Sequence, residues 1–141
     1  MYYFNKKLDA VNSQVKLLIE IKTFPLLNNK NLKMNPIKLP NTLVQWKGKD
    51  LIPFYGRYDN GSIAIQLMDS DEPYAIITSA HPLVHVTDDE VFIKTWSGHE
   101  DIIEPLRKAG IIGNLLKTHD GGYVTYEIYQ LLKKPTDLPK R

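Results

Sequence analysis

The stretch from Tyr58 to Thr78, YDNGSIAIQLMDSDEPYAIIT, constrains the fold more than any other part of the chain. Asn60-Gly61 is typical of a two-residue primed turn, in which both central residues take a positive φ. The flanking residues 51–58 and 62–68 alternate in polarity, as paired strands do. A second break, acidic and proline-containing, then predicts a reversal into a strand at 74–79. We therefore expect three consecutive antiparallel strands here.

Two further hairpins are predicted on either side of this run. Residues 42–46 and 51–58 flank a turn at Lys47-Gly48-Lys49-Asp50, and the strands at 111–118 and 123–132 bracket a turn at His119-Asp120-Gly121-Gly122. Residues 90–96 give one more strand. Period-two alternation places one face of the central strand in the core. The residues of that face are Ile63, Ile65 and Leu67.

One helix is expected after the strand at 90–96. Ser97 and Glu100 have the spacing of a capping box, and Gly110 is placed to end the helix in a left-handed conformation. Pro105 lies inside this segment, and an interior proline bends a helix because it removes a hydrogen bond. The predicted fold is a single α+β domain, with an antiparallel sheet of about six strands and one main helix, short and kinked, packed on one face.

Composition sets the expected boundaries of this domain. Residues 34–134 are predicted to form the α+β domain, and residues 135–141 a frayed tail marked by prolines. Residues 1–33 form an amino-terminal extension. Within it, apolar residues recur at helical spacing, as in an amphipathic helix over 6–22; they are Leu8, Val11, Val15 and Leu18. Such a helix would dock on a partner or a membrane surface, or pack on the domain, and the segment is otherwise a loose extension. The alternative is that Met34 is the natural start.

Composition also limits the classes of site and of location. The 141-residue chain contains no cysteine, which excludes disulfides, thiolate zinc sites and cysteine nucleophiles. Its longest apolar runs, such as 17–21 and 111–116, are far shorter than the roughly 20 residues of a membrane-spanning helix. The amino end has no secretory-signal pattern. We therefore expect a cytoplasmic protein without membrane contact.

Charge is unevenly distributed along the chain. Residues 1–33 carry a net charge of +4 and residues 34–141 a net charge of −2, which together give the +2 of the whole chain. Proteins that bind nucleic acid through its phosphates need a concentrated basic surface. The sheet-forming part offers none in its sequence, so a protein partner is favoured over nucleic acid.

Two stretches of the chain resemble a known family. YDNGSIAIQLMDSDEPYAIIT at 58–78 and DDEVFIKTWSGHEDIIEPLRKAGII at 88–112 are similar, in order, to an uncharacterised family of small proteins from phages, prophages and other bacterial mobile elements. Its members show an NG turn, AIQL-like, EPYA-like and EVFIK-like strands, and an acidic helix that closes on KAGI. The resemblance covers roughly residues 43–132. It implies a fold and a setting, but no activity, cofactor or catalytic residue.

Few residues are arranged for chemistry. The best metal candidate is His81 with His85, near the carboxylates at 88–90, but Pro82 argues against the helix that would bring the two imidazoles onto one ion. The serines lack the glycine-flanked setting of a nucleophile, and no glycine-rich phosphate loop is present. We therefore predict no catalytic residue, no metal site and no cofactor.

The candidate interaction surface combines acidic turns with aromatic residues. Two acidic turns are able to imitate the spacing of phosphates and steer toward a basic cleft. Their residues are Asp69, Asp71, Glu72, Asp88, Asp89 and Glu90. Tyrosines on a sheet can stack bases or anchor a protein interface, although tyrosine also favours strands for structural reasons. The predicted aromatic platform consists of Tyr55, Tyr123 and Tyr129 together with Arg57.

These patterns favour a binding protein over an enzyme. The first hypothesis is a non-catalytic accessory protein of a phage or other mobile element, which binds a host or phage protein and inhibits a host defence factor. The alternative is a single-stranded nucleic-acid-binding protein that uses the aromatic platform and the lysine-rich amino end. A further alternative is a metal-dependent hydrolase built on His81, His85 and the acidic residues nearby.

Overall fold

The structure is a computed structural model that describes residues 36–82 and 84–140. The predicted amino-terminal helix and the alternative start at Met34 lie outside these residues. The described chain contains one helix and eight strands. In chain order they are β2 (Ile37–Lys38), β3 (Val44–Trp46), β4 (Lys49–Arg57), β5 (Ile63–Asp69), β6 (Glu72–Ile76), β7 (Glu90–Ile93), α1 (Ile103–Lys108), β8 (Ile112–Asp120) and β9 (Thr125–Leu131).

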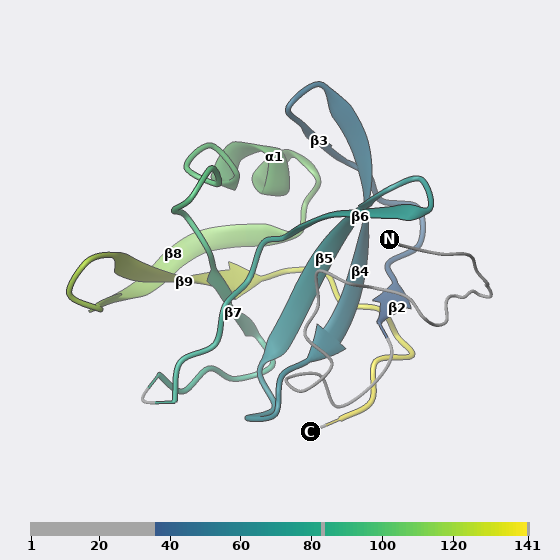
Figure 1. The fold of residues 1–141 in the computed structure, drawn as a ribbon. Coiled ribbons are helices and arrows are strands. Elements are labelled where there is room, and N and C mark those ends of the chain that lie inside the picture. Colours follow the sequence, from purple (N-terminus) through teal and green to yellow (C-terminus); the bar gives the residue numbers. More distant parts are fainter. Residues whose placement is uncertain (1–35, 83, 141) are drawn as a thin grey trace.

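Antiparallel pairing arranges these strands in two sheets (Figure 1). The first sheet has five strands in the order β2-β4-β5-β6, with β3 paired to the other end of β4. The second sheet has three strands in the order β7-β9-β8. The predicted antiparallel architecture is therefore confirmed. The prediction of a single sheet of about six strands is wrong, because the chain changes sheets between β6 and β7.

The segment that follows β6 joins the two sheets. The Ile77 amide donates to the Ile65 carbonyl of β5 at 3.1 Å, which continues the first sheet. One residue later, Thr78 pairs with Ile93 of β7 in an isolated bridge. The Lys94 amide then donates to the Ile77 carbonyl at 2.8 Å. Backbone hydrogen bonds thus fix the second sheet against the first.

The short helix begins later than the sequence predicts. Ser97 has a φ of 57° and makes no cap; α1 begins at Ile103, and its N-cap position, Ile102, has no side-chain hydrogen bond. The predicted capping box is therefore wrong, because a tight turn of positive φ at Ser97 precedes the helix instead. Pro105 lies in the first turn, where its missing amide hydrogen needs no partner. Gly110, with a φ of 76°, follows the helix as expected.

The hairpin turns differ in type from the predictions. The Asn60-Gly61 turn has three residues rather than two: the Tyr58 amide donates to the Ser62 carbonyl at 2.8 Å, and only Gly61 has a positive φ, of 88°. A primed two-residue turn lies instead at Lys47-Gly48, where φ is 52° and 75°. Both hairpins themselves are confirmed.

The main hydrophobic core lies between the two sheets and α1. The predicted core face of β5 is confirmed, since Ile63, Ile65 and Leu67 are at most 1% exposed. Leu106 of α1 and Ile93 of β7 are also fully buried in this cluster. A second, smaller cluster lies on the outer face of the second sheet. It consists of Val84, Val86, Phe92 and Ile128, with Trp96 and Tyr126 packed against it.

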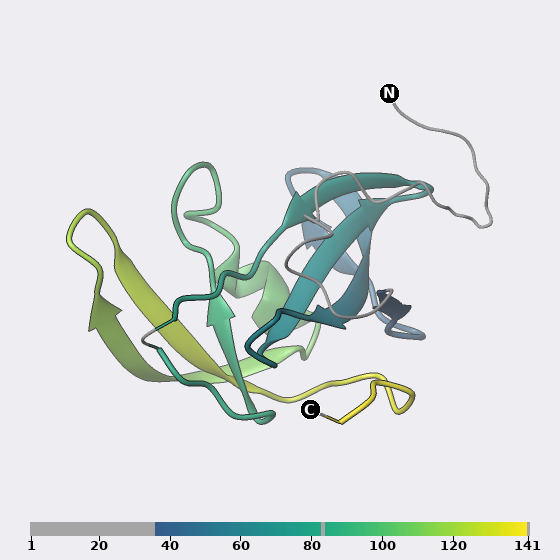
Figure 2. The ribbon, with the colours of Figure 1, turned by 60° about the horizontal axis from the view of Figure 1, so that its bottom comes forward.

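The carboxyl-terminal segment packs on the first sheet rather than fraying from it. Figure 2 shows this segment, in yellow, leaving β9 and running beside the first sheet. The Tyr55 hydroxyl donates to the Lys133 carbonyl at 2.8 Å, and Arg57 Nε donates to the Pro139 carbonyl at 2.8 Å. Leu138 packs on the main core. The last residues therefore contribute to the stability of the domain.

Removing residues 136–141 should destabilise the domain by about 2–4 kcal/mol, because Arg57 loses an acceptor and the core loses Leu138. Leu138→Ala, which keeps the Pro139 carbonyl, should cost about 1–2 kcal/mol. Urea unfolding monitored by tryptophan fluorescence measures both. Lys140→Ala, an exposed neighbour, should change the free energy of unfolding by less than about 0.5 kcal/mol. Equal stability of the truncated and full chains would contradict this role for the tail.

Candidate interaction surface

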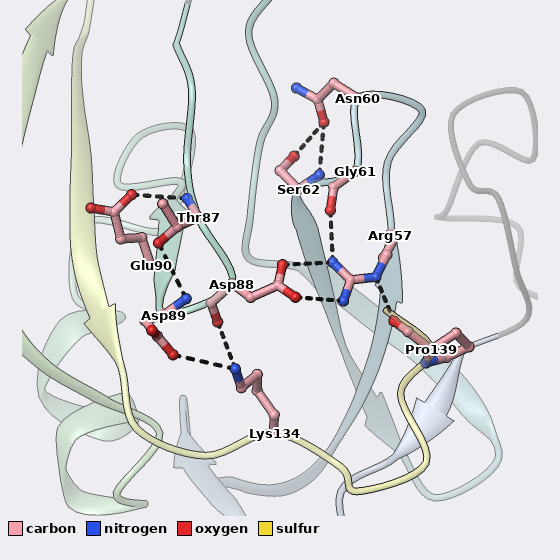
Figure 3. Close-up of polar contacts among 10 residues, drawn as sticks. All are labelled: Arg57, Asn60, Gly61, Ser62, Thr87, Asp88, Asp89, Glu90, Lys134 and Pro139. Carbon is pink, nitrogen blue, oxygen red and sulfur yellow. Dashed lines mark hydrogen bonds and ion pairs between the residues drawn. The ribbon is translucent and has the colours of Figure 1, made fainter. Parts of the chain in front are cut away.

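Arg57, at the end of β4, is 4% exposed and forms the centre of a polar network (Figure 3). Its Nη1 and Nη2 atoms donate to the two carboxylate oxygens of Asp88 at 2.9 Å each. Nη1 also donates to the Gly61 carbonyl at 2.8 Å, and Nε donates to the Pro139 carbonyl at 2.8 Å. We call this set of four residues the Arg57 latch. It joins the β4–β5 turn, the segment before β7 and the carboxyl-terminal segment.

Local hydrogen bonds hold the β4–β5 turn in the conformation that meets Arg57. Asn60 Oδ1 accepts from the Ser62 amide at 3.0 Å and from Ser62 Oγ at 2.6 Å (Figure 3). An asparagine that bonds two residues ahead in this way forms an Asx turn. This turn directs the Gly61 carbonyl toward the Arg57 guanidinium.

The segment before β7 is held by a second set of local bonds. Glu90 Oε1 accepts from the Thr87 amide at 2.9 Å, and Thr87 Oγ1 accepts from the Asp89 amide at 3.3 Å. Lys134 Nζ donates to the Asp88 carbonyl at 2.9 Å (Figure 3). These bonds fix the backbone on both sides of the Asp88 carboxylate.

The acidic turn at 88–90 is largely neutralised within the chain. Asp88 pairs with Arg57, Asp89 Oδ1 lies 3.4 Å from Lys134 Nζ, and Glu90 Oε2 lies 3.6 Å from Lys117 Nζ. Burial of the guanidinium requires the Asp88 counter-charge, since a buried unpaired cation is costly. The prediction that Arg57 belongs to an open binding surface is therefore wrong, whereas the Asp88 side chain is paired with it but still 33% exposed.

The other acidic turn lies at the opposite end of β4. Asp69 pairs with Lys49, the first residue of β4, at 3.0 Å, and this bond raises the pKa of Lys49. Arg57 is the last residue of the same nine-residue strand, so the two turns lie about 26 Å apart along it. Asp71 and Glu72 are exposed. The two turns thus form separate patches and not one acidic surface.

The predicted tyrosine platform does not form. Tyr55 is fully buried, and burial raises the pKa of its hydroxyl. Tyr129 is 5% exposed; burial and the 2.6 Å hydrogen bond to Glu127 raise the pKa of Tyr129 to about 12. Both rings belong to the main core, because their strands turn these positions inward. Only Tyr123, beyond the end of β8 in the β8–β9 turn, is fully exposed.

A different group of aromatic rings lies on the outer face of the second sheet. Tyr126 of β9 is at its centre, with ring centroids at 4.9 Å from Phe92, 5.3 Å from His81, 5.5 Å from Trp96 and 6.0 Å from His119. All but Phe92 are partly exposed. We call these five residues the ring cluster. It is the half-exposed aromatic surface of the described chain that sequence analysis missed.

Strand register explains how the ring cluster forms. His119 pairs directly with Tyr126 across β8 and β9, so their side chains share a face of the sheet. Phe92 pairs with Ile128, two residues along β9 and on the same face. The residues come from four separate segments, and β8 has two register irregularities. In the sequence, the ring cluster is indicated only by the period-two spacing of Tyr126 and Ile128, which places both side chains on one face of a strand.

The β8–β9 hairpin also carries exposed apolar side chains. Its outer part, from His119 to Tyr126, extends beyond the residues that β9 pairs with β7 (Figure 1). Leu115 is 46% exposed, Leu116 is 48% exposed, and Tyr123 lies at the tip. Leu115 pairs with Tyr129, which faces the main core, so Leu115 lies on the other face of the hairpin from the ring cluster. We call Leu115, Leu116 and Tyr123, together with the ring cluster, the arm surface, which includes both faces of the hairpin. β8 is the last strand of its sheet, so this surface adjoins a sheet edge.

The histidines are arranged differently from the predicted pair. His81 lies beside His119, with ring centroids 5.7 Å apart, whereas His85 is exposed. Among residues 36–82 and 84–140, no group of three or more histidine or acidic side chains is placed to hold a metal ion. The structure therefore does not assemble His81, His85 and the carboxylates at 88–90 into a site.

His99 packs against Trp46 in a separate aromatic contact. The two rings meet edge to face with centroids 5.3 Å apart, and Trp46 Nε1 donates to Asp101 at 2.9 Å. His99 Nδ1 is buried and has no hydrogen-bond partner among the described residues. Burial, together with the nearby charges of Lys94 and Lys47, lowers the pKa of His99.

No family model, curated protein or solved structure matches this chain. In the part of the chain that the structure describes, no helix has the length and apolar character needed to cross a membrane.

Asp88→Asn should destabilise the domain by about 1–3 kcal/mol, because it leaves the buried Arg57 without a counter-charge. Combining it with Arg57→Met should cost at least about 1 kcal/mol less than the two separate effects together, since the residues act as a pair. Chemical denaturation measures all three variants. Asp89→Asn is the matched control, and its exposed side chain should contribute less than about 0.5 kcal/mol. Additive costs would show that the pair is not coupled.

The His99 imidazole should titrate below its ordinary pKa of 6.5 in a proton NMR titration. Because the folded pKa is lowered, the unfolded state binds more protons as pH falls below about 6.5, and the domain loses stability there. His99→Phe should remove this part of the pH dependence while keeping a ring against Trp46. A midpoint at or above 6.5 would contradict the described burial.

Proposed function

We propose that this chain is a non-catalytic binding protein that recognises a protein partner through the arm surface. The supporting observation is the gathering of apolar side chains on the β8–β9 hairpin. Of the five large hydrophobic residues exposed in the described chain, three lie there, namely Leu115, Leu116 and Tyr123. Exposed aromatic side chains are enriched at protein interfaces, and several exposed apolar residues on one hairpin give a partner apolar area to bury.

The ring cluster supports the same proposal. Tyrosine and tryptophan are enriched among the residues that dominate binding energy, because they bury a large area at a small cost in side-chain entropy. The Tyr126 ring contacts the rings of Phe92 and Trp96, so little conformational freedom remains to be lost when a partner covers the cluster. Lys117, which pairs with Glu90 on the same face, adds a charge at its border.

The proposal also includes the biological setting, namely that the chain is an accessory protein of a phage or other mobile element. The resemblance to proteins of mobile elements favours a host or phage protein as the partner, and inhibition of a host defence factor as the effect. The acidic turns give this effect little support, since they lie at opposite ends of β4 and Asp88 is held by Arg57. The arm surface is the better candidate for contact.

Single-stranded nucleic acid is the second candidate ligand. Bases stack on exposed aromatic side chains, and the rings of Trp96, Tyr126 and His119 are partly exposed on one face. The lysines of residues 1–33 offer the charge that such binding needs. The mildly acidic composition of residues 34–141 makes this candidate second to a protein partner.

Leu116→Lys should lower capture of a stoichiometric protein partner from host lysate by at least about tenfold, since it places a charge in the proposed interface. Tyr123→Ala should act in the same direction. Leu43→Lys is the matched control, because Leu43 is 52% exposed and lies outside the arm surface. Quantitative mass spectrometry of the captured proteins measures all variants. Capture that is equal for Leu116→Lys and Leu43→Lys would overturn the proposal.

A salt-dependent gel shift with single-stranded DNA and RNA tests the second candidate. Binding that weakens steeply with salt and is lost in Trp96→Ala would favour nucleic acid over a protein partner.

A further inference from the structure

Two of the four histidines in the chain lie side by side on the outer face of the second sheet. His81 precedes β7 in the connection between the sheets, and His119 lies in β8. Their ring centroids are 5.7 Å apart and their planes are inclined at 49°. Imidazole nitrogens are preferred ligands of Zn²⁺, Ni²⁺ and Cu²⁺. We propose that His81 and His119 together bind a divalent transition-metal ion, with water in the remaining positions.

The separation of the rings fits a shared ion. A zinc–nitrogen bond of about 2.0–2.1 Å places the metal about 3.2 Å from the centre of each ring. Two rings around a tetrahedral ion then have centres about 5.2 Å apart. The observed distance of 5.7 Å exceeds this by an amount that a small side-chain rotation supplies.

The surroundings hold both rings near this geometry. His119 is fixed by its position in β8 opposite Tyr126, and its ring stacks on the Tyr126 ring with an interplanar angle of 11°. The His81 ring contacts the same tyrosine at 5.3 Å. The His81 carbonyl accepts from the Val84 amide at 3.1 Å. Metal binding therefore needs little ordering of the protein.

The chain has few other residues that bind transition-metal ions, so mutations can test the site specifically. There is no cysteine, and the other two histidines are His85 and His99. His99 lies against Trp46, in a separate contact. His85 lies between the buried residues Val84 and Val86 and is exposed. His85 therefore provides a control at the position that sequence alone paired with His81.

Calorimetric titration of the full, tag-free chain with ZnCl₂ tests the site. We expect one ion per chain, displaced by a chelator, and a fall in affinity of at least about tenfold in His119→Ala and in His81→Ala. His85→Ala should bind zinc as the original chain does. NMR spectra should show the imidazole signals of His81 and His119, and not those of His85, shifting on addition of zinc.

Absence of zinc binding, or an equal loss in His85→Ala, would overturn the site. His119→Asn and His81→Asn, checked for an unchanged unfolding midpoint, separate a lost ligand from a disturbed sheet. If these folded variants bind zinc normally, the assignment is also wrong. The result is independent of the proposed function, because partner capture with and without chelator is measured separately.

Discussion

The hydrogen bonds and the ion pair of the buried Arg57 guanidinium join the β4–β5 turn, the segment before β7 and the carboxyl-terminal segment. A cation at 4% exposure is tolerated only when charge and hydrogen bonds surround it. Asp88 supplies the charge, and the carbonyls of Gly61 and Pro139 supply the remaining acceptors. These partners come from a hairpin turn, the connection between the sheets and the carboxyl-terminal segment. The same burial that stabilises the domain withdraws Arg57 from contact with a partner.

Local patterns predicted the strands well because each hairpin is specified by neighbouring residues. Alternation around Ile63, Ile65 and Leu67 gave the correct core face, and the Lys47-Gly48 turn gave a correct hairpin. The division into two sheets was not predictable from these signals. It depends on residues 77–79, which bond first to β5 and then to β7, and no local sequence pattern predicts this change of partner. The start of the helix was predicted too early, because Ser97 adopts a turn instead of a cap.

The candidate site was less predictable than the fold, for a physical reason. Tyr55 and Tyr129 are strand residues whose direction depends on which face becomes the core, and both point inward. The ring cluster requires residues 81, 92, 96, 119 and 126 to meet, and their meeting follows from the β8–β9 register and from the path between the sheets. Two register irregularities in β8 remove the simple alternation that would have revealed it. Tyr123 was the one tyrosine correctly expected at the surface.

The span of the Arg57 latch also bears on the order of folding. Arg57 and Gly61 are four residues apart in the chain, whereas Arg57 is 31 residues from Asp88 and 82 residues from Pro139. Short loops close at a smaller entropic cost than long ones, so the β4–β5 hairpin has the advantage in forming first. The Arg57 guanidinium stays solvated until the two sheets assemble, because only then do Asp88 and Pro139 come within hydrogen-bonding distance. Desolvation of Arg57 would thus be a late event that marks completion of the native state.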